Sequence, residues 1–391
     1  MSLTIQTNAL RTALTSLSKV SASSGTLPIL ACVHLNAKTF QGVTLEATNL
    51  EMGLRIQIPG ADEDLNVAVP AKTLAEVVAA AGEETLNLSL EGGKLLITGK
   101  GIKSRIAIQD ADDYPPMPHC EHMAVTMAAN QLKLALKKVV VAASNDQCRP
   151  ALMTVQIAHD NGKITFAAAD GFRLAAQEID GSFDLPGDKK SLCIPAAVIR
   201  KLIPMLPDDD DQIVTVSVNE QVSQVGFSWP GFDVYASLSD LNFPDWRPIV
   251  PKSPAHTIDL PADFAGAVKR AEVFGELSGN HVVTLETVGG NLVVKGISEE
   301  DGESRTTFEG VQMPFNIGFN AVFAIQGLDA VRMTGTSVHL HLGSAANAPA
   351  MLTNGSREYI YVIMPMLISE AVAIKKAADA AEKVAAAEGQ A

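Results

Sequence analysis

Cysteine, long apolar runs and basic residues are scarce in this sequence, and each shortage excludes a class of protein. The chain has 391 residues and four cysteines, Cys32, Cys120, Cys148 and Cys193. Their wide spacing in a long chain excludes the disulfide framework of a small secreted domain and favours a reducing compartment. No apolar run reaches the ~18 residues that a membrane helix needs. The first residues also lack the basic start and apolar core of a secretory signal. We therefore expect a soluble, cytoplasmic protein with no membrane partner.

The shortage of basic residues limits how the chain could bind nucleic acid. It has 44 acidic and 30 basic residues, a net charge of −14. Phosphate contacts need lysine and arginine, so a uniformly basic nucleic-acid binder is excluded. A protein that is acidic outside and basic on one surface stays possible, because only the distribution of charge decides. With 47% hydrophobic residues, the chain is long enough for two or three globular domains.

Motifs that carry catalysis are missing as well. The sequence has no phosphate-binding loop, no HExxH and no GxSxG. Two clusters could hold a metal, 118-PHCEH-122 and 208-DDDD-211. The first lacks a suitably spaced fourth ligand and the second follows a predicted helix, so a linker and a solvated loop are favoured. We expect no catalytic residue, metal or cofactor, and a metal-dependent enzyme using either cluster is the less favoured alternative.

What the chain does contain is a threefold internal repeat. Each copy has two units, and each unit is a short strand followed by an amphipathic helix. The first unit occupies 3–14, 125–136 and 257–268, and the second occupies 67–78, 192–203 and 316–328. This period is far longer than that of a solenoid, so the copies are domains. The pattern predicts an α+β fold of three homologous domains at 1–121, 122–254 and 255–367, followed by an Ala-rich C-terminal extension at 368–391.

One hairpin of the second copy departs from the repeat. In 168-AADGFRLA-175, the pair Asp170-Gly171 separates two alternating stretches, which predicts a tight turn. The matching segment of the first copy, 44-TLEATNLEMGL-54, lacks the glycine and the arginine. Since the fold does not demand Gly171 and Arg173 in every copy, we expect a site here. The alternative is an ordinary hairpin with one solvated charge.

Several motifs together resemble one known family. The hairpin motif is accompanied, in order along the chain, by 26-TLPIL-30, 149-RPAL-152, 242-NFPDW-246 and 361-YVIMPM-366. With this combination the chain resembles, over residues 1–366, the bacterial DNA sliding clamps, the beta subunits of the replicative DNA polymerase. The resemblance implies the DNA-clamp fold, a head-to-tail homodimeric ring with helices inside and sheets outside. It implies a non-catalytic processivity factor that encircles duplex DNA without sequence specificity. Its implied partners are DNA polymerase subunits, the clamp loader and other proteins that carry a short clamp-binding peptide.

The resemblance also assigns a pocket for partner peptides between the second and third domains. Its residues are Leu152, Ala169, Gly171, Phe172, Arg173, Leu174, Pro244, Ile249, Val362, Met364, Pro365 and Met366. Arg173 is expected at the rim, hydrogen-bonded to the peptide. Many relatives have Thr and His where this chain has Ala169 and Phe172, so a more apolar pocket is expected. A clamp relative with altered partner binding therefore stays open as an alternative.

Two further surfaces follow from the resemblance. The dimer interface is expected to place Ile106 and Ile108 against Val273 and Phe274. The predicted helices carry ten basic residues: Arg11, Lys19, Lys72, Lys133, Lys137, Lys138, Arg200, Lys201, Lys269 and Arg270. Because the resemblance places these helices around the hole of the ring, we expect the ten residues to face DNA. The alternative is that they form solvated helix faces.

Overall fold

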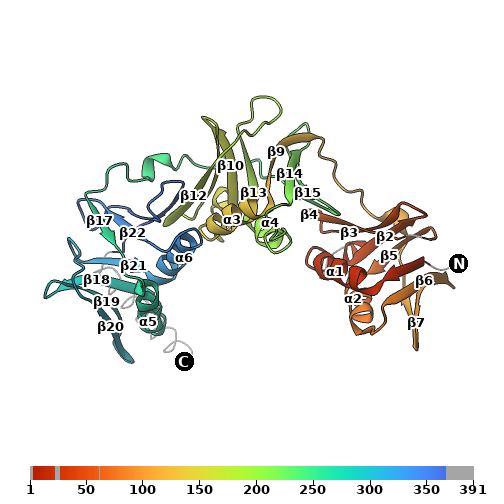
Figure 1. Cartoon of the computed structure of the whole chain (residues 1–391), viewed down its shortest axis with the longest axis horizontal. Helices are drawn as coiled ribbons and strands as arrows, with labels where there is room; N and C mark the ends of the chain where they lie inside the picture. Colours follow the sequence, from red (N-terminus) through yellow and green to blue (C-terminus); the bar gives the residue numbers. More distant parts are fainter. Residues whose placement is uncertain (1–2, 23–26, 61, 367–391) are drawn as a thin grey trace, which may run out of the picture. The chain divides into compact units, whose positions relative to one another are not determined.

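The structure, a computed structural model, describes residues 3–22, 27–60 and 62–366 (Figure 1). Over these residues, groups of antiparallel strands alternate with six α-helices, as expected for an α+β fold. The chain divides into two compact units: unit 1 comprises 1–133 and 182–240, and unit 2 comprises 134–181 and 241–391. All three boundaries fall inside the second predicted domain, so the division into three domains stays a prediction. The predicted extension 368–391 lies outside the described residues.

Unit 1 contains an eight-stranded and a four-stranded antiparallel sheet. The larger has the order β5-β2-β3-β4-β16-β15-β14-β9 and the smaller β1-β6-β7-β8. Their strands are β1 (Leu3–Gln6), β2 (Cys32–Lys38), β3 (Gly42–Thr48), β4 (Met52–Ile58), β5 (Leu65–Pro70), β6 (Thr85–Glu91), β7 (Lys94–Gly99), β8 (Ile102–Ala107), β9 (His122–Ala128), β14 (Ile213–Val218), β15 (Gln224–Trp229) and β16 (Phe232–Ser237). Helices α1 (Thr7–Leu17) and α2 (Ala71–Ala80) pack on each other, and β13 (Ser191–Pro195) leads into α4 (Ala196–Leu202).

Unit 2 is built in the same way. One set of its strands runs in the order β10-β11-β12-β24-β23-β22-β17, and a four-stranded sheet has the order β20-β19-β18-β21. The strands are β10 (Thr154–Asp160), β11 (Lys163–Ala169), β12 (Arg173–Asp180), β17 (His256–Asp259), β18 (Val282–Val288), β19 (Asn291–Ser298), β20 (Gly302–Phe308), β21 (Ile317–Asn320), β22 (His339–Leu342), β23 (Ala350–Thr353) and β24 (Tyr359–Ile363). Helix α5 (Phe264–Leu277) packs on α6 (Ala321–Arg332), while α3 (Ala129–Val140) contains the boundary between the units.

All six predicted strand–helix pairs are present. They are β1–α1, β9–α3 and β17–α5 for the first set, and β5–α2, β13–α4 and β21–α6 for the second. Pro70 and Pro195 directly precede α2 and α4, where the fixed φ of proline suits the start of a helix. Asn320 takes that position at α6, and its side chain accepts a hydrogen bond from the backbone N–H of Phe323 at 3.0 Å. The repeat in the sequence is therefore a repeat in structure.

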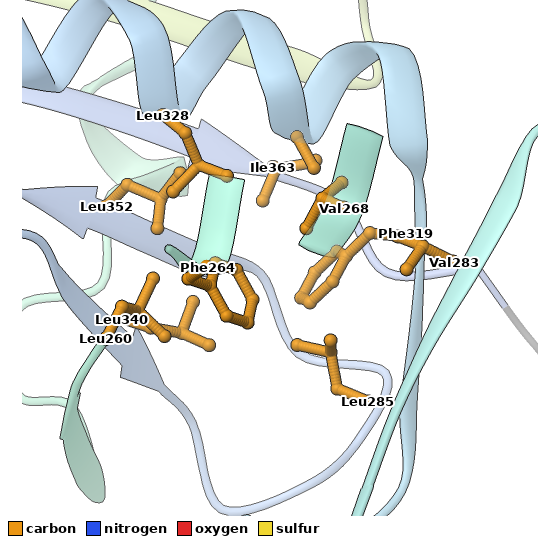
Figure 2. A pocket seen from close by; sticks show the side chains of 11 residues that line it. Leu260, Phe264, Val268, Val283, Leu285, Phe319, Leu328, Leu340, Leu352 and Ile363 are labelled. Carbon is orange, nitrogen blue, oxygen red and sulfur yellow. The ribbon is translucent and has the colours of Figure 1, made fainter. Parts of the chain in front are cut away.

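The core between α5, α6 and the sheets of unit 2 contains a small apolar cavity (Figure 2). Its volume is about 20 Å³, and side chains such as Phe264, Val283 and Phe319 line it. That volume admits roughly one water-sized sphere, but the apolar lining offers a water no hydrogen-bond partner. The cavity is therefore a packing defect and not a ligand site. Within the three described ranges, no helix has the length and apolar character needed to cross a membrane.

Candidate functional site

The predicted turn at Asp170-Gly171 joins β11 to β12. The side-chain oxygen Oδ1 of Asp170 accepts hydrogen bonds from the backbone N–H groups of Phe172 at 2.8 Å and Arg173 at 2.9 Å. Gly171 has a φ of +92°, a region that L side chains rarely adopt. A Cβ at this position would also lie 2.5 Å from Nη1 of Arg149. Both the backbone and the available space therefore require glycine, as the sequence pattern predicted.

The other edge of β12 pairs with β24, a strand almost two hundred residues later in the chain. The register places Leu174 opposite Ala169 on one side and Val362 on the other. Leu174 and Val362 are buried, whereas Phe172 is 56% exposed and Met364 is 36% exposed. The backbone N–H of Met364 donates to the carbonyl oxygen of Phe172 at 2.8 Å. The structure thus brings the exposed side chains of Phe172 and Met364 close to a strand pair in which Leu174 and Val362 are buried.

Fewer contacts define the positions of the remaining predicted pocket residues. Met366 is tied down, because its backbone N–H donates to the carbonyl oxygen of Gly318 at 2.8 Å. Leu152, on the 3-10 helix η3 (Pro150–Met153), is half-buried, and Ile249, on η4 (Arg247–Ile249), is 49% exposed. Pro244 is exposed and Pro365 is half-buried. The assignment of Leu152, Pro244 and Ile249 to the pocket rests on the resemblance.

Arg173 does not stand at the rim. Its side chain is only 9% exposed, and Nε donates to Oδ2 of Asp170 at 2.9 Å. Nη1 donates to the side-chain oxygen of Gln326 and, at 3.3 Å, to the hydroxyl of Tyr361. The guanidinium also lies 4.0 Å from the ring centroid of Phe323. This geometry corrects the expectation of a peptide-binding rim residue, because Arg173 uses these donors to fasten the turn to α6 and β24.

Tyr361 completes this network. Burial raises the pKa of Tyr361 to about 12, so its hydroxyl stays protonated at neutral pH. The hydroxyl donates to the backbone carbonyl of Phe323 at 2.9 Å while it accepts from Arg173. A buried arginine is stable only when its donors are satisfied, so the network fixes the position of the turn.

Lys138 corrects a second expectation. Its side chain is 1% exposed, and Nζ donates to the side chains of Gln177 at 2.7 Å and Thr334 at 3.0 Å. Nζ also lies 4.0 Å from the ring centroid of Tyr359. Burial lowers the pKa of the ammonium to about 8. Lys138 is therefore a buried structural cation of unit 2 and not a DNA-facing residue.

The other nine basic residues are accessible to different degrees, and eight of them lie on the helices as expected. Lys19 does not, because α1 ends at Leu17 and Lys19 lies in the turn that follows. Lys19, Lys72, Lys137, Arg200, Lys269 and Arg270 are exposed, and Arg11, Lys133 and Lys201 are half-buried. Lys133 pairs with Asp208 at 2.5 Å, and Arg11 donates to the carbonyl oxygen of Ala81 at 2.8 Å. Lys269 and Arg270 also form exposed ion pairs with acidic neighbours. Part of the positive charge on these helices is thus already balanced by the protein.

In each of the two sequence clusters that could hold a metal, at least one side chain forms an ion pair. His119 pairs with Glu121 in the first, and Asp208 pairs with Lys133 in the second. Among the described residues, no group of three or more His, Cys, Asp or Glu side chains could bind a metal ion. The geometry offers no support for the metal-dependent alternative.

Comparison with known proteins decides the family. One family model, the N-terminal domain of the DNA polymerase III beta subunit, matches residues 1–118. A second, the central domain of the same subunit, matches residues 126–245. The chain belongs to the DNA polymerase III beta subunit family. As a member, it is a sliding clamp.

Individual relatives are similar in sequence to this chain over almost its whole length. The beta sliding clamp of Bacillus subtilis is 24% identical over 384 residues, covering 94% of this chain and 99% of that protein. The beta sliding clamp of Vibrio cholerae is 24% identical over 375 residues, with 94% and 100% covered. Among solved structures, the B. subtilis sliding clamp superimposes with a TM-score of 0.85 at 22% identity, covering 94% of this chain and 99% of that one. The Pseudomonas aeruginosa beta subunit gives 0.84 at 22%, with 94% and 100% covered. The expected clamp fold is confirmed.

The residues expected at the dimer interface lie on or just after the edge strand β8 and on helix α5. Ile106 is on β8, the edge strand of the small sheet of unit 1, but it is only 5% exposed. Its contacts are therefore mostly within its own unit, and the half-buried Ile108 is the more accessible of the two. Val273 is 53% exposed and Phe274 is half-buried on α5, which packs against β20, the edge strand of the small sheet of unit 2.

Sequence reasoning overlooked residues that hold the clamp's hairpin site together. Arg149 lies with its guanidinium 5.8 Å from the ring centroid of Phe172 and limits the space at Gly171. Arg149 and Tyr361 belong to motifs already noted in the sequence, which was the available signal. Gln326 and Phe323 carry no such signal, because an amphipathic helix pattern does not show which polar partner lies across from it.

Proposed function

We propose that this clamp encircles duplex DNA as a head-to-tail homodimeric ring and tethers DNA polymerase subunits without catalysing a reaction. The observation that carries the proposal is the pattern of strand–helix pairs, whose helices bear exposed basic residues on a chain with a net charge of −14. Such helices attract the phosphate backbone without reading bases. Because duplex DNA lies in the cytoplasm of a bacterium, we propose a cytoplasmic location.

A topological experiment tests the ring. The clamp is assembled on nicked circular DNA by a clamp loader, and retention is measured by gel filtration before and after the circle is cut with a restriction enzyme. A ring stays on the circle and slides off the linear product. Equal loss from both forms would show ordinary electrostatic binding and would contradict the proposal.

The dimer would join the edge carrying β8 in one subunit to the edge carrying α5 and β20 in the other. Edge strands present unpaired backbone groups, and a head-to-tail contact closes when its rotation generates a ring. Two copies of a three-domain chain would supply six similar segments. The clamp loader would act by opening one of these interfaces.

The hairpin site would receive a short apolar peptide from polymerases, the clamp loader and other DNA-processing proteins. Leu174 and Val362 would form its floor, and Phe172 and Met364 would contact the peptide from the side. Methionine repacks readily, which suits a surface that several partners share. Calorimetry with a polymerase-derived peptide tests the site: Met364→Ala is expected to weaken binding by ~1–3 kcal/mol. Unchanged affinity would contradict the assignment and favour a clamp relative with altered partner binding.

A further inference from the structure

The last residues that the structure describes lie beside the hairpin site. The backbone N–H of Met364 donates to the carbonyl oxygen of Phe172 at 2.8 Å. Two residues later, the backbone N–H of Met366 donates to the carbonyl oxygen of Gly318 on β21 at 2.8 Å, and the two residues form an antiparallel bridge. All four residues belong to unit 2. The C-terminal extension, 368–391, therefore follows in the sequence directly after a fixed point next to this site.

The hairpin site keeps apolar surface in contact with water. Phe172 is 56% exposed and Met364 is 36% exposed, although their backbones are bonded to each other. In the adjoining strand pair, Leu174 and Val362 are buried. Burying apolar surface is favourable by ~25 cal/mol per Å². A segment with apolar side chains would therefore gain free energy by covering Phe172 and Met364.

The extension carries most of its large apolar residues close to Met366. In 368-ISEAVAI-374, the large apolar residues are Ile368, Val372 and Ile374. The rest of the extension, 375–391, has one further such residue, Val384, among many alanines and charges. Alanine has little apolar surface to bury. The part of the extension that could cover an apolar site is therefore the part nearest to that site.

The short connection makes even weak binding effective. An extended chain spans ~3.3 Å per residue, so the chain from Met366 to Val372 reaches up to ~20 Å. A short tether raises the effective concentration of a binding segment to the mM range. Competition multiplies the Kd of a partner peptide by one plus the ratio of this concentration to the segment's own Kd. At an effective concentration of ~1 mM, a segment with a Kd of ~0.25 mM raises the Kd of the peptide about fivefold.

We propose that residues 368–374 occupy the hairpin site of their own chain and compete with partner peptides. Ile368, Val372 and Ile374 would cover the exposed apolar side chains of the site. A partner would then bind only by displacing the segment, so at a given concentration the weakly binding partners are excluded first. The inference rests on the proposed function, because it assigns a regulator to the same site. The resemblance ends at residue 366 and assigns no role to this segment.

The test changes the segment in the full-length protein. One variant combines Ile368→Ser, Val372→Ser and Ile374→Ser, which removes the apolar side chains and leaves the charge unchanged. The matched control is Val384→Ser, which removes the large apolar residue outside the segment. Calorimetry with a polymerase-derived peptide is expected to show about fivefold tighter binding to the triple variant than to wild type. The affinity of Val384→Ser is expected to equal that of wild type.

A measurement without any peptide reports on the segment directly. The methyl NMR signal of Met364, assigned through Met364→Ala, is expected to move in the triple variant and to keep its wild-type position in Val384→Ser. A moved signal in proteins that bind no polymerase-derived peptide would support occupation of the site by the segment and would contradict only the proposed peptide binding.

Three results would overturn the proposal. The first is an unchanged peptide affinity in the triple variant while Met364→Ala loses affinity, which would leave the proposed function standing. The second is an equal gain of affinity in Val384→Ser, which would show that the segment 368–374 is not the occupant. The third is a gain that vanishes when the protein is diluted, which would place the segment on a second copy of the chain.

Discussion

Replacing Lys138 with methionine should make the clamp more stable at neutral pH. The ammonium is buried, and its pKa is about 8 in place of the ordinary 10.5. Each pKa unit corresponds to about 1.4 kcal/mol, so the full shift amounts to about 3.5 kcal/mol. Thr334, which accepts a hydrogen bond from Nζ, is itself exposed, so water lies close to the ammonium. We therefore reduce the free-energy cost of the buried charge to about 2 kcal/mol. Methionine keeps the length of the side chain, but Lys138→Met gives up two hydrogen bonds and a cation–π contact. A net gain of about 1 kcal/mol is expected at pH 7.

The pH dependence gives the sharper assay. Between pH 8 and 10.5 the unfolded state holds a proton on Lys138 that the folded state has released. Stability therefore rises with pH through this window in the wild type, and Lys138→Met should lack that contribution. Urea unfolding is measured at pH 7, 8 and 9.5, with the exposed neighbour changed in Lys137→Met as control. At each pH, the free energy of unfolding of the wild type is subtracted from that of the variant, which cancels the contribution of all other titrating groups. A constant difference for Lys138→Met across the three pH values would refute the reasoning.

Four further predictions follow from other parts of the clamp. Phe274→Ala should weaken the proposed dimer by ~2 kcal/mol or more, which sedimentation at falling concentration would detect as dissociation. Gly171→Ala should lower the free energy of unfolding by at least ~1 kcal/mol, measured by urea, because φ is +92° and Arg149 occupies the space. Burial opposes protonation of His34, but hydrogen bonds to Glu46 and Asn66 outweigh it and raise the pKa above 6.5. The stability from His34 is thus complete below pH 6.5 and lost as pH rises through the folded pKa, and His34→Gln should lack this loss in unfolding curves. Val283→Ile should fill the cavity of about 20 Å³ and raise the free energy of unfolding by about 0.5 kcal/mol, visible as a higher melting temperature.

Local features of this fold could be predicted from the sequence because local chemistry determines them. Pro70 and Pro195 start helices through their fixed φ, and Asp170-Gly171 forms its turn through one carboxylate and one permissive residue. The spacing of apolar residues along the chain predicted the six strand–helix pairs. None of these needs information from a distant part of the chain.

The errors arose where distant segments decide the environment of a charge. Lys138 lies on a helix whose pattern allows either face to be solvated, and its aromatic neighbour Tyr359 is over two hundred residues away. Arg173 has the same problem, since Gln326 and Tyr361 come from other elements. A single sequence shows that a charge is present, but burial and pairing depend on which strands and helices meet. The assignment of a peptide pocket to Leu174 and Val362, in contrast, came from the resemblance and stays a prediction.

The pairing of β12 with β24 sets an order of events during synthesis. The hairpin of β11 and β12 leaves the ribosome long before Tyr359–Ile363, so until β24 arrives one edge of β12 has no partner there. An unpaired strand edge readily pairs with another chain, and a growing chain is exposed to this risk for as long as the edge stays open. The same arrangement means that Leu174 has no Val362 beside it until translation is nearly complete. Under the proposed function, an unfinished clamp would therefore lack the proposed peptide site, and partners would be recruited only by molecules whose last strand is in place.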